Sequence, residues 1–371
     1  MFSKTYDAVI VGGGVIGASI LAQIARSGQI KTVLLEKMSF GMNGPTAKSG
    51  GMLRTYHPDS YLSDLAYESM PHFMNFEQLY GSSCGYTKTG LIVVEPAERL
   101  DAVKKEVERI NRQSPVLEWK QGPGDAFGSS ICTGKQDIAI FEERAGYANP
   151  SLTAQAWVNF SRGCGMDAME GIAVTELMVK NGKATGVRTT AGNIAADIII
   201  VAAGAWSKKI VEQAIGRSAP IRSKAIQMDA FIRPDKTEAP LPFTDYTNQL
   251  YGKQGAGSVH MIGLPVDQWD IDPDQEEAVD PVLAEHTRVC AAGRLDWVKG
   301  ALYAGGKRSF DAYCTNGRGW TGQVDGVEGL LVCTGWGGGG FKVAPAVGKI
   351  IAELAEKCLD RKRKVFQIKE C

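Results

Sequence analysis

The fold of this chain is decided by Asp7-Ala-Val-Ile-Val-Gly12-Gly13-Gly14-Val15-Ile16-Gly17. Residues 7–11 are mostly apolar and rich in β-branched side chains, which predicts a short buried strand. Residues 16–27 repeat apolar side chains at helical spacing, and Gly28 follows where such a helix would end. The stretch therefore predicts a strand, a glycine turn and a helix in direct succession.

Three glycines in this turn have the spacing G-x-G-x-x-G. Gly12 permits the tight turn, Gly14 lets the backbone approach a pyrophosphate at the helix N-terminus, and Gly17 lets the helix pack closely on the strand. A second strand candidate at 31–36 closes a βαβ unit and ends at Glu36, whose carboxylate can bind ribose hydroxyls. These features predict a Rossmann-type dinucleotide-binding fold, with NAD and FAD both open at this point.

Length and composition limit the class of protein. A chain of 371 residues exceeds the roughly 250 to 300 residues over which one core grows, so we expect two domains. Lysine plus arginine equals aspartate plus glutamate at 41 each, so no net positive field attracts nucleic acid or an anionic membrane. The eight cysteines form no C-x-x-C pair, and no apolar run is long enough to span a bilayer. We therefore expect reduced thiols, no metal site, no membrane span and a cytoplasmic location.

The pattern of predicted strands and helices changes along the chain. Strand-like and charged-helix patterns occupy 81–145, and strand-like stretches with a Pro- and acid-rich loop occupy 220–299. The βα texture of residues 1–80 returns at 146–219 and again at 300–371. We therefore expect an α/β fold in which a discontinuous Rossmann-type domain is interleaved with a sheet-rich α+β substrate domain made from the two other pieces.

Two further motifs accompany the glycine turn. The first is Ala196-Asp197-Ile-Ile-Ile-Val-Ala-Ala-Gly204-Ala205-Trp206-Ser207, an apolar strand that ends in small residues and lets the chain pass close to a nucleotide. The second lies at 326–348 and contains Trp336-Gly-Gly-Gly-Gly340-Phe341-Lys342. With these motifs the chain resembles the D-amino acid oxidase superfamily of FAD enzymes, in the branch of glycine oxidase and sarcosine oxidase. The form of the last motif is most similar to that of sarcosine oxidase β subunits.

The resemblance implies FAD as the cofactor, bound without a covalent link. Some sarcosine oxidases attach their flavin to a cysteine, but that position is Ser309 here, with Cys314 displaced along the chain. The family's usual Thr-Pro-Asp near this point reads Cys314-Thr315-Asn316. The expected cofactor-binding residues are Gly12, Gly14, Val15, Ile16, Gly17, Glu36, Lys37, Ser49, Gly50, Gly51, Met52, Val174, Ala202, Ala203, Gly204, Trp206, Gly337, Gly338, Gly339, Gly340, Phe341 and Lys342.

The resemblance also implies that Arg54 and Lys342 hold the carboxylate of a substrate. A bidentate guanidinium and an ammonium can neutralise a carboxylate in a desolvated pocket and fix its α-carbon, independently of the resemblance. A cation at a helix N-terminus, where Lys342 stands, is unfavourable and needs some reason. Arg308 falls near the arginine that glycine oxidase uses for the same task, and a plain surface arginine is the alternative reading.

Three other side chains are candidates for the same pocket. Tyr251 and His260 lie in the segment expected to roof the flavin, and His57 follows shortly after the arginine of the carboxylate pair. The alternative for each histidine is a packed or hydrogen-bonded side chain. The lysine that activates dioxygen in monomeric sarcosine oxidase has no clear counterpart, because the matching strand offers His260 and Met261. The electron acceptor is therefore open.

These residues indicate an FAD-dependent amine or amino acid oxidoreductase. It would pass a hydride from the α-carbon of an amino acid or N-alkyl amino acid to the flavin and leave an imine. One alternative is a dehydrogenase subunit that passes electrons to a partner instead of dioxygen. Another is a biosynthetic tailoring oxidase for a larger amine, for which the glycines at 337–340 would open space.

Overall fold

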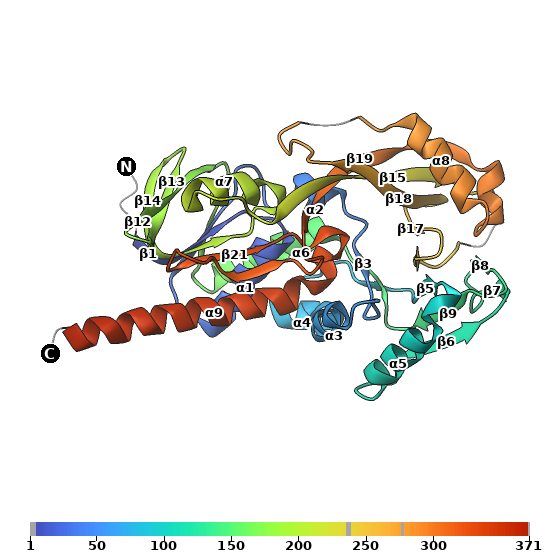
Figure 1. The fold of residues 1–371 in the computed structure, drawn as a ribbon, viewed down its shortest axis with the longest axis horizontal. Helices are drawn as coiled ribbons and strands as arrows, with labels where there is room; N and C mark the ends of the chain where they lie inside the picture. The colour runs from blue at the N-terminus through green and yellow to red at the C-terminus, as the bar shows by residue number, and fades with distance from the viewer. Residues whose placement is uncertain (1–4, 235–238, 276–277, 370–371) are drawn as a thin grey trace.

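The computed structural model describes residues 5–234, 239–275 and 278–369. Two eight-stranded sheets dominate the described chain, one toward each end of its longest axis, and helices cover both (Figure 1). The mixed α/β class expected from the sequence is confirmed.

The first sheet has the strand order β11-β2-β1-β14-β13-β12, with β21 paired to β14 and β20 paired to β21. The strands are β1 (Thr5–Val11), β2 (Thr32–Leu35), β11 (Asp167–Met169), β12 (Val174–Lys180), β13 (Lys183–Thr189), β14 (Gly192–Val201), β20 (Trp320–Gln323) and β21 (Leu330–Thr334). The strands β11, β2, β1, β14 and β21 run parallel. Their carboxyl ends therefore meet at one edge of the sheet, which is where open α/β sheets bind ligands.

Both faces of the central strands of this sheet are buried, which explains why β2, β21 and most of β1 read as continuous apolar runs. Along β1, Ala8 and Ile10 face one core while Val9 and Val11 face the other. The first core includes side chains from α1 (Val15–Ser27), α3 (Ser60–Met74), α4 (Phe76–Tyr80), α6 (Pro150–Gly163) and α9 (Gly340–Lys369). The second core includes side chains from α7 (Ser207–Ile215) and from the β12–β13 hairpin.

Helix α1 packs closely against its neighbours because small residues lie at the contacts. The helix ends where Gly28 adopts a left-handed conformation at φ 66°, as a glycine C-cap does. Toward α9, a Cβ added at Gly348 would lie 2.5 Å from Oγ of Ser19, and that hydroxyl donates to the carbonyl of Ala344 at 2.8 Å. The N-terminal and C-terminal parts of the chain are thus packed against each other under the first sheet.

The second sheet has the strand order β19-β15-β18-β17-β16-β5-β9-β6. Its strands are β5 (Leu91–Glu95), β6 (Leu117–Gln121), β9 (Ile138–Glu142), β15 (Ile221–Ile232), β16 (Phe243–Asp245), β17 (Leu250–Gln254), β18 (Val259–Trp269) and β19 (Leu302–Cys314). Its cores also take side chains from α5 (Leu100–Asn111) and α8 (Pro281–Ala291). Smaller pairings join β3 (Met52–Leu53), β10 (Gly146–Tyr147) and β4 (Thr87–Lys88), and join β7 (Gly124–Asp125) to β8 (Cys132–Thr133).

One expected domain boundary differs from the strand pairing. We expected 300–371 to belong to the Rossmann-type domain, but β19 pairs with β15 from Ile221 opposite Cys314 to Ile232 opposite Leu302. The physical reason is that β15 is twelve residues long and its backbone groups need partners on both sides, which β18 and β19 supply. The rest of the division into two domains stays a prediction.

Two general properties of the described residues complete the fold. None of the described cysteines forms a disulfide bond, and Cys371 lies outside the described residues. Among the helices described, none has both the length and the apolar character needed to cross a membrane.

Candidate active site

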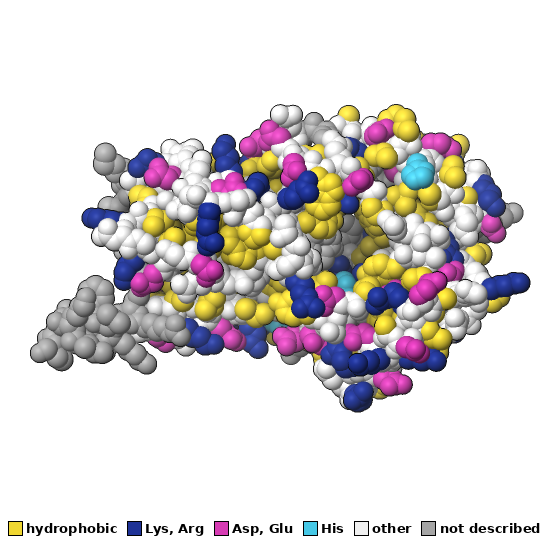
Figure 2. Space-filling model, viewed as in Figure 1, with side chains coloured by type: hydrophobic (Ala, Val, Ile, Leu, Met, Phe, Trp, Pro, Cys, Tyr) yellow, Lys and Arg dark blue, Asp and Glu magenta, His cyan; other side chains and the backbone are white. Residues whose placement is uncertain are grey.

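A cavity of about 1840 Å³ opens at the carboxyl edge of the first sheet. The loops that follow β1, β2, β14 and β21 line it on one side, and strands β15, β17 and β19 line it on the other. Figure 2 shows the molecular surface hollowed in this middle region. Pockets for a single small molecule measure roughly 300 to 1,000 Å³, so this cavity can hold a dinucleotide and a second, smaller molecule.

The glycine turn has the geometry that a dinucleotide requires. Gly12 has φ +106°, and a Cβ there would lie 2.7 Å from the carbonyl oxygen of Ala202. Gly14 is the N-cap of α1 in extended conformation and makes no side-chain cap, and the first turn carries no acidic side chain. A Cβ at Gly17 would lie 1.9 Å from the carbonyl oxygen of Gly12, so only glycine lets the helix approach the turn. Helix N–H groups without intrahelical partners therefore face a side of the cavity where an anion is favoured.

Glu36 is held at the end of β2 by the turn itself. Its Oε2 accepts a hydrogen bond from the backbone N–H of Gly13 at 2.7 Å, and its Oε1 accepts one from Met38 at 2.9 Å. A carboxylate oxygen accepts more than one hydrogen bond, so lone pairs remain for ribose hydroxyls. The predicted position of this residue beside the turn is consistent with its expected role.

A cluster that the sequence did not reveal closes the cavity near β2. The ammonium of Lys37 lies 2.8 Å from Oδ1 of Asp274 and 4.0 Å from the ring centroid of Trp206. The indole N–H of Trp206 donates to the same carboxylate oxygen at 2.7 Å, and these two hydrogen bonds lower the pKa of Asp274. The acid-rich loop that follows β18 thus contacts the first sheet. From the sequence we expected this loop to belong only to the substrate domain.

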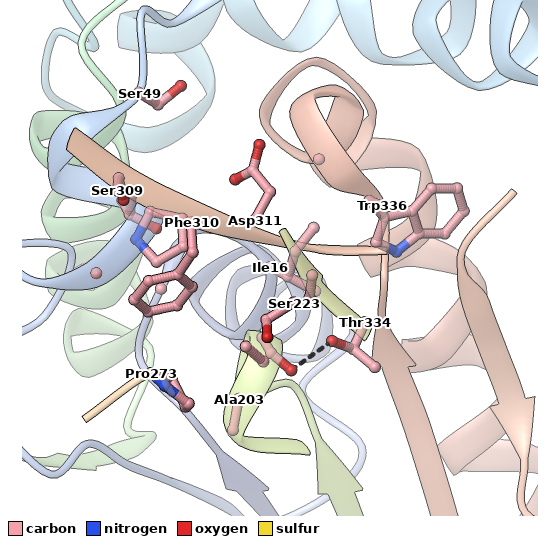
Figure 3. A pocket seen from close by; sticks show the side chains of 18 of the residues that line it. Ile16, Ser49, Ala203, Ser223, Pro273, Ser309, Phe310, Asp311, Thr334 and Trp336 are labelled. Atoms are coloured by element: carbon pink, nitrogen blue, oxygen red, sulfur yellow. Dashed lines mark hydrogen bonds between the residues drawn. The ribbon is translucent and has the colours of Figure 1, made fainter. Parts of the chain in front are cut away.

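The motifs after β14 and β21 are tied together beneath the cavity. Oγ1 of Thr334 donates to the carbonyl of Gly204 at 2.9 Å, near Ala203 in Figure 3. After β21 the chain turns through a short 3-10 helix, Gly337–Gly339, into α9, whose first turn carries no acidic residue. Gly337 has φ +52°, and a Cβ there would lie 2.4 Å from the ring of Tyr313. The aromatic ring thus occupies the space that the missing side chain leaves.

Every residue predicted to bind the cofactor lines this cavity except Gly17, which acts beneath the turn as described. The lining residues come from segments that are far apart in the chain, such as Glu36, Val174 and Phe341. Their convergence is consistent with the predicted cofactor site.

Arg54 and Lys342 meet at the other end of the cavity. Arg54 is only 6% exposed, and its guanidinium donates to the hydroxyl of Tyr246 at 2.9 Å and to the carbonyl of Tyr56 at 3.4 Å. Lys342 is 8% exposed and donates to the carbonyl of Gly338 at 3.0 Å. Neither cation has a carboxylate within ion-pair distance in the described part of the chain.

The electrostatics of this end follow from its burial. Desolvation and the nearby Arg54 together lower the pKa of Lys342 to about 7, against the opposite effect of Asp311. Burial also lowers the pKa of His57 well below its usual value, with the two cations adding to the effect. His57 is therefore neutral, and its Nε2 has no hydrogen-bond partner among the described groups. The pocket concentrates positive charge and has no anion of its own beside Arg54.

Asp311 is a cavity residue that the sequence analysis missed. It lies on β19 and points to the opposite side of the strand from Phe310, into the space between Ser49 and Trp336 (Figure 3). Desolvation raises the pKa of its carboxyl to about 6, against the attraction of Lys342. A signal was available, because aspartate is disfavoured inside a strand and this one interrupts an otherwise strand-like run.

Tyr251 and Arg308 also line the cavity, as expected. The Tyr251 ring lies across Gly263, where a Cβ would be 2.3 Å from it, and burial raises the pKa of its hydroxyl. Arg308 is buried and donates to the side-chain carbonyls of Gln227 at 3.1 Å and Gln268 at 2.5 Å. The alternative of a plain surface arginine does not fit this burial.

His260 does not reach the cavity, which corrects its expected role there. It is 0% exposed and stacks on Phe243 with ring centroids 6.4 Å apart, with Trp297 edge-on at 5.7 Å. Alternate side chains of a strand point to opposite faces, and His260 shares the face of Ile262, which belongs to the core covered by α8. The packed reading of this histidine is the one that its position supports.

The two residues considered for a covalent flavin link differ in position. Ser309 lines the cavity, and its hydroxyl has no hydrogen-bond partner among the described atoms. Cys314 is 6% exposed and lies at the end of β19, outside the cavity lining. The side chain that faces the cavity is therefore a hydroxyl, which is consistent with a noncovalent cofactor.

Comparison with known families agrees with this geometry. The model of the DAO family, described as FAD dependent oxidoreductase, matches residues 7–354. The 4-methylaminobutanoate oxidase (formaldehyde-forming) of Paenarthrobacter nicotinovorans is 23% identical over 93% of this chain, which spans only 43% of the length of that relative. The sarcosine oxidase subunit beta of an Arthrobacter species is 24% identical over 94% of this chain and 86% of its own length.

Known structures show the same fold. The L-proline dehydrogenase from P. horikoshii superposes with a TM-score of 0.84 at 20% identity, covering 96% of this chain and 94% of the other. A glycine oxidase from Bacillus cereus superposes with a TM-score of 0.75 at 21% identity, covering 95% of each chain. The path of the chain is thus shared at low sequence identity.

Proposed function

Because this chain belongs to the DAO family of FAD dependent oxidoreductases, we propose that it oxidises the carbon–nitrogen bond of an amino acid or N-alkyl amino acid. The relatives named above carry activities on amines or amino acids, and their names support this substrate class. The physical support comes from the cavity, which has room for a small molecule beside a dinucleotide.

The residues present fit FAD held without a covalent bond. The N-terminus of α1 and Glu36 would hold the diphosphate and ribose, and the turn before α9 would hold the isoalloxazine ring. The chemistry that FAD supplies when bound is acceptance of a hydride from the carbon next to nitrogen, which leaves an imine for water to hydrolyse. The protein contributes orientation, exclusion of water and electrostatics.

One observation carries the assignment of the substrate pocket. Arg54 and Lys342 are both buried at the same end of the cavity, and the described chain places no carboxylate in contact with either. Burying a cation without a partner costs free energy, which an incoming carboxylate would recover. His57, whose pKa is lowered by its burial and by both cations, is neutral and adds no competing charge. We therefore assign this end to the carboxylate of the substrate.

The alternative of a larger amine depends on the space beside the glycines at 337–340. The Tyr313 ring fills the space beside Gly337, whereas a Cβ added at Gly339 would meet no atom within 4 Å, so the run leaves room at Gly339 but not at Gly337. The choice between dioxygen and a protein partner as electron acceptor depends on reoxidation and needs its own measurement.

Anaerobic mixing tests the proposal. The purified holoenzyme is mixed with a panel of amino acids and N-methyl amino acids, and the flavin absorbance is followed. Bleaching by at least one member supports the proposal, and failure of every small amine contradicts it. With the substrate found, peroxide formed in equal amount to the imine identifies an oxidase, whereas slow reoxidation identifies a dehydrogenase that needs a partner.

A further inference from the structure

Asp311 is a carboxylate inside the cavity without a side-chain partner. The described part of the chain offers it no hydrogen bond and no ion pair, and Lys342 attracts it only from a longer distance. Its Oδ2 faces the turn before α9, since a Cβ added at Gly338 would lie 3.8 Å from it. Asp311 is half-buried and lines the cavity, so its unpaired carboxylate is available to a cationic group of a bound ligand.

The groups around Asp311 come from three elements. Lys342 at the head of α9 attracts it, and the hydroxyls of Tyr251 on β17 and Tyr313 on β19 are close enough for its charge to raise their pKa. Arg54 also lies near enough to Lys342 to lower the pKa of the lysine, and both cations lower the pKa of His57. The cavity thus presents two cations at one place and one anion beside them.

This arrangement matches a zwitterion better than a simple carboxylate. A ligand that carried only a carboxylate would be neutralised by Arg54 and Lys342 but repelled by Asp311. An α-amino acid carries an ammonium one carbon away from its carboxylate, so it can satisfy both charges at once. The unpaired aspartate would then have the partner that the protein does not supply.

We propose that Asp311 binds the ammonium group of the substrate and accepts one proton from it. The transfer is balanced, because the ammonium loses one proton and becomes a neutral amine while the carboxylate becomes a carboxylic acid. The nitrogen lone pair is then free to support cleavage of the adjacent C–H bond. The proposal rests on the proposed function, and it adds the residue that selects an amine and prepares it for oxidation.

A ligand-binding experiment separates this role from a structural one. The probes are N-methylglycine and its isostere methoxyacetate, which has the carboxylate but no ammonium, together with trimethylglycine, which has the positive charge but no proton to give. Binding to the holoenzyme is measured by calorimetry without oxygen. We expect Asp311→Asn to weaken N-methylglycine and trimethylglycine at least tenfold, and to leave methoxyacetate unchanged or bound more tightly.

The control is Asp296→Asn, an exposed aspartate that does not line the cavity and should change no affinity. Flavin content and melting temperature report whether each variant is folded, and Asp311→Glu should restore part of the selectivity. Equal weakening of all three ligands by Asp311→Asn would overturn the proposal. So would a wild-type holoenzyme that binds methoxyacetate as well as N-methylglycine, or that binds neither.

A second readout concerns the proton. In Asp311→Asn the substrate must lose its proton to solvent, so the acid limb of the flavin-reduction rate should move to higher pH. An unmoved limb would contradict proton acceptance. The role of Asp311 and the proposed function can fail separately. If the enzyme still binds carboxylates through Arg54 and Lys342 but does not select ammonium ligands, only the role of Asp311 fails. If it selects ammonium ligands but no amine reduces the flavin, only the proposed function fails.

Discussion

The two ends of the cavity are formed by different kinds of chemical groups. The nucleotide end is made of backbone, glycine turns and helix N-termini, and its polar side chains are paired, as Glu36 and Lys37 show. The substrate end is made of ionisable side chains without an ion-pair partner, namely the buried Arg54 and Lys342 and the half-buried Asp311. The polar side chains of the nucleotide end have partners within the protein, whereas the charged side chains of the substrate end obtain counter-charges only from a bound ligand.

The difference shows how the two ends would respond to change. A backbone site fails as a unit when one close approach is blocked, since nothing else can replace the geometry. A side-chain site loses one charge at a time and should lose affinity in steps. The following predictions test this contrast.

The largest effect should come from Gly17→Ala at the nucleotide end. Its added carbon would lie 1.9 Å from the carbonyl oxygen of Gly12, so α1 cannot keep its approach to the turn. We expect loss of nearly all bound FAD, measured as flavin absorbance relative to protein absorbance. Gly163→Ala is the matched control, because no atom lies within 4 Å of a Cβ there. Normal flavin content in Gly17→Ala would break the contrast.

The next effect should come from Arg54→Ala and Lys342→Ala at the substrate end. Each should weaken a carboxylate inhibitor by roughly 1.5 to 3 kcal/mol, the range for charge-assisted hydrogen bonds, while FAD stays bound. Titration of the flavin spectrum with the inhibitor measures the change. Lys349→Ala, on the exposed side of the same helix, is the control. Unchanged affinity in both pocket variants would retire the assignment.

The pH dependence of carboxylate binding should be smaller and graded. The pKa of Lys342 is lowered to about 7, so the lysine loses its charge as the pH rises through that value. Asp311, with a pKa of about 6, becomes negative over the range just below and repels a carboxylate. We expect inhibitor affinity to be highest below pH about 6 and to fall by about tenfold per pH unit above about 7. The upper part of the fall should vanish in Lys342→Ala, and a flat profile in the wild type would contradict these assignments.

The smallest effect should come from His260→Leu. The histidine packs between Phe243 and Trp297, away from the cavity, and a side chain of similar volume should cost less than about 1.5 kcal/mol of folding stability. We expect kcat/KM to stay within about twofold of wild type. A tenfold change would correspond to about 1.36 kcal/mol of activation free energy. Thermal unfolding and steady-state kinetics measure the two quantities. A tenfold loss of activity with normal stability would contradict this prediction and indicate that His260 has a role in the active site.

The sequence revealed the nucleotide end because its features are local. The glycine spacing, the acid at the end of the next strand and the two later motifs are each readable without knowing which segments meet. The substrate end depends on contacts between distant segments, so Asp311 and Tyr246 went unnoticed, and for the same reason so did Asp274 beside Lys37 at the nucleotide end. His260 was misplaced for a related reason, since a shift of one position along β18 moves a side chain from one face of the sheet to the other.

The walls of the cavity come from segments that lie far apart in the chain. The first wall begins at Gly12, whereas β19, β21 and the head of α9 supply the last ones. During synthesis, nearly the whole polypeptide must therefore leave the ribosome before a flavin can be enclosed. Cofactor capture would then be among the final events of maturation, and a shortage of FAD in the cell would leave a nearly folded chain with an open, apolar gap that chaperones and proteases could recognise.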